Sequence, residues 1–193
     1  MRVNEIFYSL QGEGYHTGAA AVFVRLSGCN LRCPFCDTDH EEGREMSENE
    51  IAEEAGRYPA RLVVVTGGEP TLQLTATLVE ALHARGKRVA VETNGTLPPP
   101  SNVDWVTLSP KESWLGAEAR PVIARADELK VLFDGVHLPP SYDTVSVDHR
   151  FLQPCDTGDA QRNAAITEQT IEYIKSHPEW RLSLQIHKTV NIK

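Results

Sequence analysis

Short apolar runs that alternate with helical stretches limit the folds open to this chain more than any other feature does. The runs are rich in Val, Leu and Ile, most are bounded by Gly or Pro, and they occupy 20–26, 61–66, 88–93, 103–108, 128–133, 150–152 and 182–186. Continuous runs of this kind are typical of parallel strands that are buried on both faces. Because parallel neighbours need crossover connections, the pattern predicts βα units with right-handed crossovers.

Three helical stretches lie between or after these runs. Their expected apolar faces comprise Ile51, Ala55 and Tyr58; Leu74, Leu78 and Leu82; and Ile171 and Ile174. Ser47 and Glu50 form a capping box for the first, Gly86 ends the second, and His177-Pro178 ends the third. A complete barrel of eight such units usually needs about 250 residues, and this chain has 193. We therefore expect one domain over 1–193, an α/β fold with an incomplete TIM-type barrel of about six parallel strands.

Charge and composition narrow the class of partner. Asp and Glu total 27 against 19 Lys and Arg, so the formal net charge is −8. A chain this acidic is poorly suited to a polyphosphate backbone, and we expect a small-molecule substrate rather than nucleic acid. Nowhere do 18 apolar residues run together, and the first residues lack the apolar stretch of a signal peptide. We therefore expect a cytoplasmic protein that does not bind a membrane.

Three of the four cysteines crowd into eight residues, as Cys29-Asn-Leu-Arg-Cys33-Pro-Phe-Cys36, directly after the run at 20–26. Cytosolic thiols stay reduced, so clustered cysteines indicate a metal site or catalysis rather than disulfides. An iron–sulfur cube has four irons that each normally take a thiolate, and three thiolates leave one iron open to a small molecule. Cys155 stands apart, and by itself it is typical of a small buried hydrophobic residue.

Two other interpretations of the cysteine loop stay open on the residues alone. Cys33 and Cys36 are spaced as a dithiol redox pair, although Cys29 then has no role. His40 supplies a possible fourth ligand, so the loop could instead hold structural zinc in an interaction module.

A second motif, Thr66-Gly67-Gly68-Glu69-Pro70, ends the run at 61–66. Paired glycines let the backbone approach a ligand closely, and the carboxyl ends of barrel strands are where such folds bind ligands. Alone, this motif is typical of an ordinary turn. Next to a cysteine loop that also follows a strand, it indicates a binding site.

Together these segments resemble the radical S-adenosylmethionine (SAM) enzymes. Cys29, Cys33 and Cys36 match the cluster-binding motif of that superfamily, and Gly67-Gly68-Glu69 matches its strand-end motif. The resemblance implies the radical SAM fold, a [4Fe-4S] cluster chelated by SAM, and one-electron cleavage of the sulfonium to a 5′-deoxyadenosyl radical. A protein of this kind holds its substrate against the radical and excludes water.

Within the superfamily, the chain resembles the 7-carboxy-7-deazaguanine synthases over nearly its whole length. The resemblance is carried by residues 5–14, 24–26, 36–38, 109–111, 153–154 and 182–188. It implies a carbon–nitrogen lyase that converts 6-carboxy-5,6,7,8-tetrahydropterin to 7-carboxy-7-deazaguanine with loss of ammonia, in 7-deazapurine and queuosine synthesis. It further implies Mg²⁺ as a cofactor, a flavodoxin or ferredoxin as the reductant, and a homodimer.

The same resemblance implies roles for individual residues. The substrate contacts that it predicts are Leu10, Gln11, Gly12, Glu13, Arg25, Thr66, His187 and Lys193. The predicted cofactor contacts are Phe35, Cys36, Asp37, Gly68, Glu69, Ser109, Pro110, Lys111, Gln153, Pro154, Cys155 and Asp156, with Thr38 as the Mg²⁺ ligand. Arg25 offers a planar fork for the substrate carboxylate. Judged without the family, Arg25 is typical of a solvated ion pair and His187 of a structural histidine.

A rival activity and one departure from the family stay open. A glycyl-radical-activating enzyme shares the cysteine loop and the Gly-Gly-Glu turn but acts on another protein, so segment 11–14 and Thr38 favour the small substrate. In relatives a terminal carboxylate, often after a proline, approaches the substrate. Here the last residues are Asn191-Ile192-Lys193, which leaves that contact without its usual sequence context.

Overall fold

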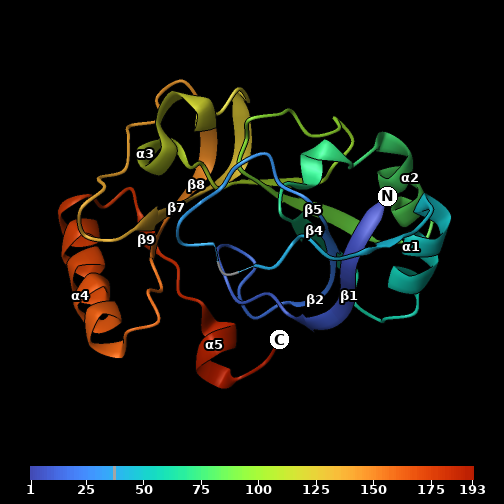
Figure 1. The fold of residues 1–193 in the computed structure, drawn as a ribbon, viewed down its shortest axis with the longest axis horizontal. Coiled ribbons are helices and arrows are strands. Elements are labelled where there is room, and N and C mark those ends of the chain that lie inside the picture. The colour runs from blue at the N-terminus through green and yellow to red at the C-terminus, as the bar shows by residue number, and fades with distance from the viewer. Residues whose placement is uncertain (37) are drawn as a thin grey trace.

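The apolar runs form one mixed sheet in the computed structural model of the protein, which describes residues 1–36 and 38–193 (Figure 1). The strands are β1 (Arg2–Leu10), β2 (Ala20–Leu26), β3 (Arg44–Glu45), β4 (Leu62–Gly67), β5 (Arg88–Thr93), β6 (Trp105–Leu108), β7 (Arg125–Phe133), β8 (Ser146–Pro154) and β9 (Arg181–Leu182). Their order across the sheet is β3-β1-β2-β4-β5-β6-β7-β8-β9.

The expected partial barrel is confirmed. Neighbouring strands from β2 to β9 are parallel, whereas β1 pairs antiparallel with β2 and β3 pairs antiparallel with β1. Six of the parallel strands, β2 and β4 to β8, have four or more residues, and β9 adds two. Over the described part of the chain the sheet does not close on itself, because β3 and β9 remain its two ends.

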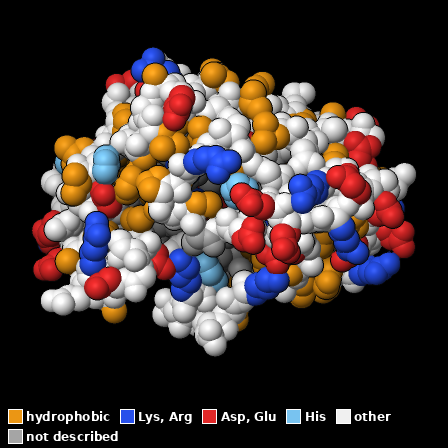
Figure 2. All heavy atoms as spheres, in the orientation of Figure 1, with side chains coloured by type: hydrophobic (Ala, Val, Ile, Leu, Met, Phe, Trp, Pro, Cys, Tyr) orange, Lys and Arg blue, Asp and Glu red, His pale blue; other side chains and the backbone are white. Residues whose placement is uncertain are grey.

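The helices are α1 (Glu48–Gly56), α2 (Ala76–His83), α3 (Glu112–Leu115), α4 (Ala160–Ser176) and α5 (Ile186–Val190), with short 3₁₀ turns η1 (Pro70–Leu72) and η2 (Gly116–Ala119). Helices α1, α2 and α4 pack against the strands of this sheet. The capping box at α1 is confirmed: the Ser47 side chain accepts from the Glu50 backbone N–H, and the Glu50 carboxylate accepts from the Ser47 N–H at 2.7 Å. The polar face of α1 contributes acidic side chains to the right-hand edge of the surface in Figure 2.

The two faces of each inner strand have different characters. On the outer face, Val22, Val24 and Leu26 of β2 pack with Ile51 and Leu78 of the covering helices in a fully buried core. Because side chains alternate along a strand, the intervening positions face the inside of the barrel. There, the apolar residues Ala21, Phe23, Val64, Ala90 and Trp105 form a separate cluster.

Polar residues replace this inner apolar cluster toward the carboxyl ends of the strands. Two positions after Phe23 comes Arg25, paired in register with Thr66 of β4, and two positions after Ala90 of β5 comes Glu92. The barrel interior is therefore apolar at one end and hydrogen-bonding at the other, and the second end is where ligands bind in barrel folds.

Several predicted boundaries are wrong. The run at 182–186 is a strand only as far as Leu182. Beyond it the Ile186 N–H donates to the Gly12 carbonyl of the β1–β2 loop, and the chain enters α5 at Ile186. Tyr58 follows α1 rather than lying on it, and Leu74 precedes α2. The sequence patterns also do not predict β1, whose residues mix charged and apolar types on both faces.

The open side of the barrel is crossed by the β1–β2 loop, which reaches the segment that follows β9 (Figure 1). The Ile186 N–H donates to the Gly12 carbonyl at 3.0 Å, the Gly14 N–H donates to Ser183 Oγ at 3.0 Å, and Gln185 donates to Glu13. This loop and the segment 183–193 therefore join the two sides of the unclosed sheet. No helix in the described residues is long and apolar enough to cross a membrane.

Candidate active site

The three clustered cysteines line one cavity of about 210 Å³ at the carboxyl ends of the strands. Cys29 and Cys33 are half-buried, Cys36 is exposed, and all three thiols are free. Burial raises the pKa of the Cys29 and Cys33 thiols above their usual value, so no nearby group stabilises these thiolates strongly enough to offset burial. A bound metal cluster supplies that stabilisation, because thiol ligands are deprotonated when they coordinate metal.

The Gly-Gly-Glu turn is shaped by its contact with the cysteine loop. A Cβ atom at Gly68 would lie 2.0 Å from the Gly28 carbonyl oxygen, and one at Gly67 would lie 2.3 Å from the Leu26 oxygen. The Glu69 N–H donates to the Gly28 carbonyl at 2.8 Å. The paired glycines therefore permit a close approach, as expected, and the partner that requires it is the backbone just before Cys29.

Glu69 ties this turn to the end of β5. It is 1% exposed, and its carboxylate accepts hydrogen bonds from Thr93 Oγ1 at 2.7 Å and from the Asn94 and Thr71 N–H groups at 2.7 and 3.0 Å. The Asn94 side chain in turn donates to Asn30 in the cysteine loop at 3.0 Å. Turn, strand end and cysteine loop thus form one rigid polar unit along the cavity wall.

Most of the predicted cofactor contacts lie around the same cavity. Its walls include Phe35, Cys36, Gly68, Glu69, Ser109, Lys111, Gln153, Cys155 and Asp156. Pro110 and Pro154 are not on its walls, and Asp37 lies outside the described residues. Burial lowers the pKa of Lys111, whose Nζ donates to Ser109 Oγ at 2.8 Å. These assignments to the cofactor stay predictions.

The donor set fits an iron–sulfur cluster with an open corner. Three cysteine sulfurs face one cavity that has further room beside them, as three thiolate ligands and a small-molecule chelate require. His40, the fourth ligand of the zinc alternative, lines the same cavity, and its buried Nδ1 has no hydrogen-bond partner among the residues that the structure describes. Within 1–36 and 38–193, no three His, Cys, Asp or Glu side chains are arranged to hold a single metal ion.

A second cavity of about 300 Å³ adjoins the first. All of the residues predicted to contact substrate line it: Leu10, Gln11, Gly12, Glu13, Arg25, Thr66, His187 and Lys193. Thr38, the predicted Mg²⁺ ligand, lines it too. The sequence places these residues up to 183 positions apart, and the fold brings them together from β1, the β1–β2 loop, β2 and the loop after it, β4 and the final segment.

One side of the second cavity is cationic. Arg25 Nε lies 3.0 Å from Glu5 Oε1, and Lys193 Nζ pairs with the other oxygen of the same carboxylate. The Arg25 side chain is 22% exposed, so its ion pair is partly buried rather than fully solvated. Glu5 therefore keeps both cations at the cavity wall, where they suit an anionic group.

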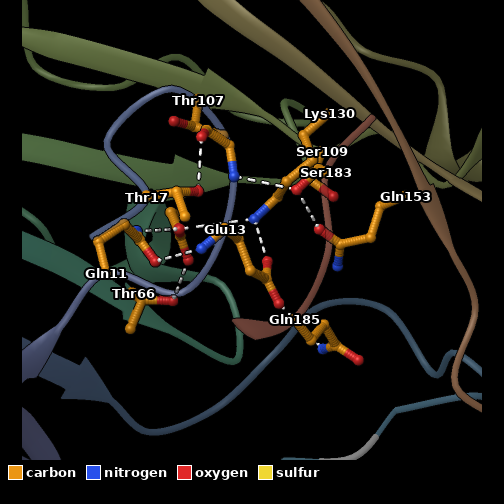
Figure 3. A network of polar contacts seen from close by, with 12 residues as sticks. Gln11, Glu13, Thr17, Thr66, Thr107, Ser109, Lys130, Gln153, Ser183 and Gln185 are labelled. Carbon is orange, nitrogen blue, oxygen red and sulfur yellow. Dashed lines mark hydrogen bonds and ion pairs between the residues drawn. The ribbon is translucent and has the colours of Figure 1, made fainter. Parts of the chain in front are cut away.

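The wall of the second cavity also carries two acidic residues, Glu13 and Glu92, of which only Glu13 is predicted from the sequence. Glu13 accepts from Lys130 of β7 and from Gln185 (Figure 3). Glu92 of β5 pairs with the same lysine. Glu92 accepts from Gln11 Nε2 at 3.0 Å and from Thr66 Oγ1 at 3.1 Å. The sequence did contain a signal for Glu92 and Lys130. Both lie inside runs that otherwise suit buried strands, where a charged residue is rare unless it is paired.

The electrostatics of these acidic residues are dominated by burial and by Lys130. Burial opposes ionisation of Glu13, but Lys130 outweighs it and lowers the pKa of the Glu13 carboxyl to about 2. The surrounding carboxylates raise the pKa of Lys130 despite its burial. Glu128 accepts from the Tyr15 N–H at 3.0 Å, and burial raises its pKa to about 7.

The two cavities share a wall made of Glu13, Thr66, Gly67, Glu92 and Gln185. A cofactor held in the first cavity and a molecule held in the second would therefore lie next to each other at these residues. The geometry suits a cofactor on the cysteine side and a small substrate in the second cavity, whose wall carries both cationic and acidic side chains.

Comparison with known proteins agrees with this geometry. The family model of the radical SAM superfamily matches residues 23–110. The chain is 48% identical over 192 residues to the 7-carboxy-7-deazaguanine synthase of Bacteroides thetaiotaomicron, covering 100% of this chain and 98% of that protein. It is 44% identical to the synthase of Bordetella pertussis, covering 98% of each chain. The crystal structure of QueE from Escherichia coli aligns with a TM-score of 0.72 at 30% identity, over 95% of this chain and 92% of that one.

Proposed function

The chain belongs to the 7-carboxy-7-deazaguanine synthase family of the radical SAM superfamily, and from this we propose that it is a carbon–nitrogen lyase that converts 6-carboxy-5,6,7,8-tetrahydropterin to 7-carboxy-7-deazaguanine with loss of ammonia. The observation that carries the proposal is the adjoining pair of cavities. One holds the three cysteines, the other holds every predicted substrate residue, and they meet at one wall.

On the cofactor side, Cys29, Cys33 and Cys36 would hold a [4Fe-4S] cluster. When bound there with SAM, the cluster supplies a 5′-deoxyadenosyl radical. Gly68 lets the turn lie against the cysteine loop, and Ser109 and Lys111 place a hydroxyl and a cation on the same cavity wall. These groups suit the ribose and the carboxylate of SAM.

On the substrate side, the charges of the cavity match the two ends of a carboxylated pterin. Arg25 and Lys193 lie together on one side and suit the substrate carboxylate. Gln11 and Glu13, which also line this cavity, suit the amide and guanidine edge of the pterin ring. The Thr38 hydroxyl, a hard oxygen ligand, suits Mg²⁺ beside the substrate.

We extend the proposal to the partners that such an enzyme needs. Reduction of the cluster calls for a one-electron donor, and we propose a flavodoxin or a ferredoxin. We also propose a homodimer that works in the cytoplasm and supplies 7-deazapurine synthesis, including that of queuosine.

The test is anaerobic reconstitution followed by turnover. Enzyme with iron, sulfide, dithionite, SAM, Mg²⁺ and 6-carboxytetrahydropterin should form 7-carboxy-7-deazaguanine, which mass spectrometry identifies. A colourless protein that binds one zinc through Cys29, Cys33, Cys36 and His40 would establish the interaction-module alternative. A cluster-loaded enzyme that ignores the pterin and places a glycyl radical on another protein would establish the activating-enzyme alternative.

A further inference from the structure

Lys130 occupies an unusual position for a lysine. It lies on β7, inside the barrel, and is only 6% exposed. Lysine is almost never this buried without a charged partner, and Lys130 has two at hand on the wall between the cavities. Its Nζ donates to Glu13 Oε2 and lies 3.6 Å from Glu92 Oε1.

Each of these carboxylates is also held from a second side. Gln185 Nε2 donates to Glu13 Oε1 at 2.9 Å, and Thr66 Oγ1 donates to Glu92 Oε2 at 3.1 Å. Lys130 is the one cation that both carboxylates contact among the described residues. It therefore fixes the orientation of Glu13 and Glu92 relative to each other. Figure 3 shows its contact with Glu13.

The charge balance makes this role necessary. Glu13, Glu92 and Glu128 all interact electrostatically with Lys130 in a region shielded from water. Without a cation, adjacent buried carboxylates repel each other, and one of them takes up a proton. A protonated carboxyl loses acceptor capacity, so it would no longer accept two N–H groups from a ligand.

We propose that Lys130 is a positioning residue for the substrate: it holds Glu13 and Glu92 as one preorganised acceptor edge for the N–H groups of the pterin ring, where the two cavities meet. Lys130 acts through the carboxylates and takes no part in the chemistry. This inference rests on the proposed function, because it takes the pterin as the ligand of the second cavity.

The chain offers a matched control in Lys87. This lysine is 8% exposed, and its Nζ donates to the carbonyls of Tyr58 and Ala60 at 2.6 and 2.8 Å. It precedes β5, at the opposite end of the barrel strands from the cavities. Lys87→Met therefore removes the ammonium of a lysine with similarly low exposure without touching the acidic wall.

The experiment uses reconstituted holoenzyme with SAM present, as wild type, Lys130→Met, Lys130→Arg and Lys87→Met. The dissociation constants of 6-carboxytetrahydropterin and of SAM are measured, along with the 5′-deoxyadenosine formed per product. Lys130→Met should weaken pterin binding by about 30-fold or more, the scale for breaking a buried charge pair. Lys130 lines the cofactor cavity, but its ion pairs run to the two carboxylates of the shared wall, so SAM binding should change by less than about 3-fold. The variant should also release 5′-deoxyadenosine without product. Lys130→Arg should restore most of the affinity, and Lys87→Met should lower thermal stability alone.

The pH dependence separates positioning from a general loss of structure. In Lys130→Met the Glu13 carboxyl takes up a proton as the pH falls, so the ratio of the variant to the wild-type pterin dissociation constant should be larger at pH 6 than at pH 8.5. The other charged groups around Lys130 and Glu13, namely Glu92, Glu128, Lys111 and His187, are present in both proteins. A pH-independent ratio would overturn the proposal.

A double variant keeps the test decisive if Lys130→Met does not fold. With Glu13→Gln as background, adding Lys130→Met should weaken pterin binding by no more than about 3-fold, because the main group that Lys130 positions is gone. A further loss of 30-fold in that background, or equal effects of Lys130→Met and Lys87→Met on pterin binding, would overturn the inference. Failure of the wild type to bind the pterin at all would instead refute the proposed function.

Discussion

The two cavities of the site are built in different ways. The cofactor cavity takes its three cysteines from eight consecutive residues, and backbone contacts such as Gly68 against Gly28 set its shape. The substrate cavity takes its walls from β1, β2, β4, β5 and the final segment, and side-chain charges join them. The shape of the cofactor cavity therefore depends on how closely two backbone segments can approach each other. The shape of the substrate cavity depends on how its partly buried charges are paired.

This difference predicts two kinds of sensitivity. A substitution on the cysteine side should act on cluster assembly and local packing, because no neighbouring residue can replace a lost cysteine ligand and no larger residue fits in place of the glycines. A substitution on the charged side should act on substrate binding and on pH dependence, while the cluster still forms. The following variants test that division, from the largest expected effect to the smallest.

Cys33→Ala should abolish cluster assembly and all product formation while the chain stays folded. Removing one of three thiolates leaves two irons without a protein ligand. Iron and sulfide analysis after anaerobic reconstitution measures the loss, and far-UV circular dichroism checks the fold. Normal iron content in this variant would contradict the ligand assignment.

Arg25→Ala should weaken pterin binding by about 10- to 100-fold, the scale for a hydrogen bond to a charged group. SAM binding should change far less, because Arg25 lines only the substrate cavity of the two. Titration calorimetry on the cluster-loaded enzyme measures both affinities. Equal losses for pterin and SAM would show that Arg25 supports the whole site rather than one ligand.

Gly68→Ala should destabilise the protein by about 1–3 kcal/mol, the usual cost of forcing an extra carbon into a packed region. The new Cβ would meet the Gly28 carbonyl, so the turn must move away from the cysteine loop. Reduced iron content together with a lower unfolding temperature is the expected result. Gly18→Ala is the comparison, since a Cβ there meets no atom within 4 Å and only its positive φ carries a cost. Similar iron loss in both variants would argue against the close approach as the cause.

Glu128→Gln should stabilise the fold progressively as the pH rises from 5 to 8. The folded-state pKa of Glu128, about 7, lies above its usual value of 4.5, so wild-type stability falls as the pH rises through that interval. The amide cannot ionise and avoids this loss, which is on the order of 1–2 kcal/mol after allowance for nearby Lys130. Urea unfolding at several pH values measures the free energy of unfolding of both proteins. A difference between them that does not change with pH would contradict the prediction.

Much of the fold and half of the site were predictable because the relevant patterns are local. Continuous apolar runs identified β2, β4 and β5 almost to the residue, and the capping box placed the start of α1. The cluster ligands could be predicted without tertiary information because all three cysteines lie within eight consecutive residues. The gathering of the predicted substrate residues in one cavity depended on family resemblance, because no spacing rule links Arg25 to Lys193.

The parts that were missed depend on contacts between distant segments. β1 pairs antiparallel with β2, and its alternation is blurred by Glu5, which turns inward to hold Arg25. The strand predicted at 182–186 is cut short where the chain turns to the β1–β2 loop, with the Ile186 N–H bonded to the Gly12 carbonyl. Glu92 and Lys130 lie within runs that were interpreted as apolar, and only the register of β5 and β7 shows that they face the same wall.

The bridge between the β1–β2 loop and the segment 183–193 has a consequence for the order of synthesis. Glu13 and Gln185 are 172 residues apart, and Ser9 and Lys193 are 184 apart, yet both pairs are hydrogen-bonded. A growing chain is made from its N-terminus, so the cysteine loop leaves the ribosome long before the residues that complete the pterin cavity. The three thiols are thus made while both cavities are still incomplete, because Gln185 lines each of them, and docking of the segment around α5 completes the two cavities together.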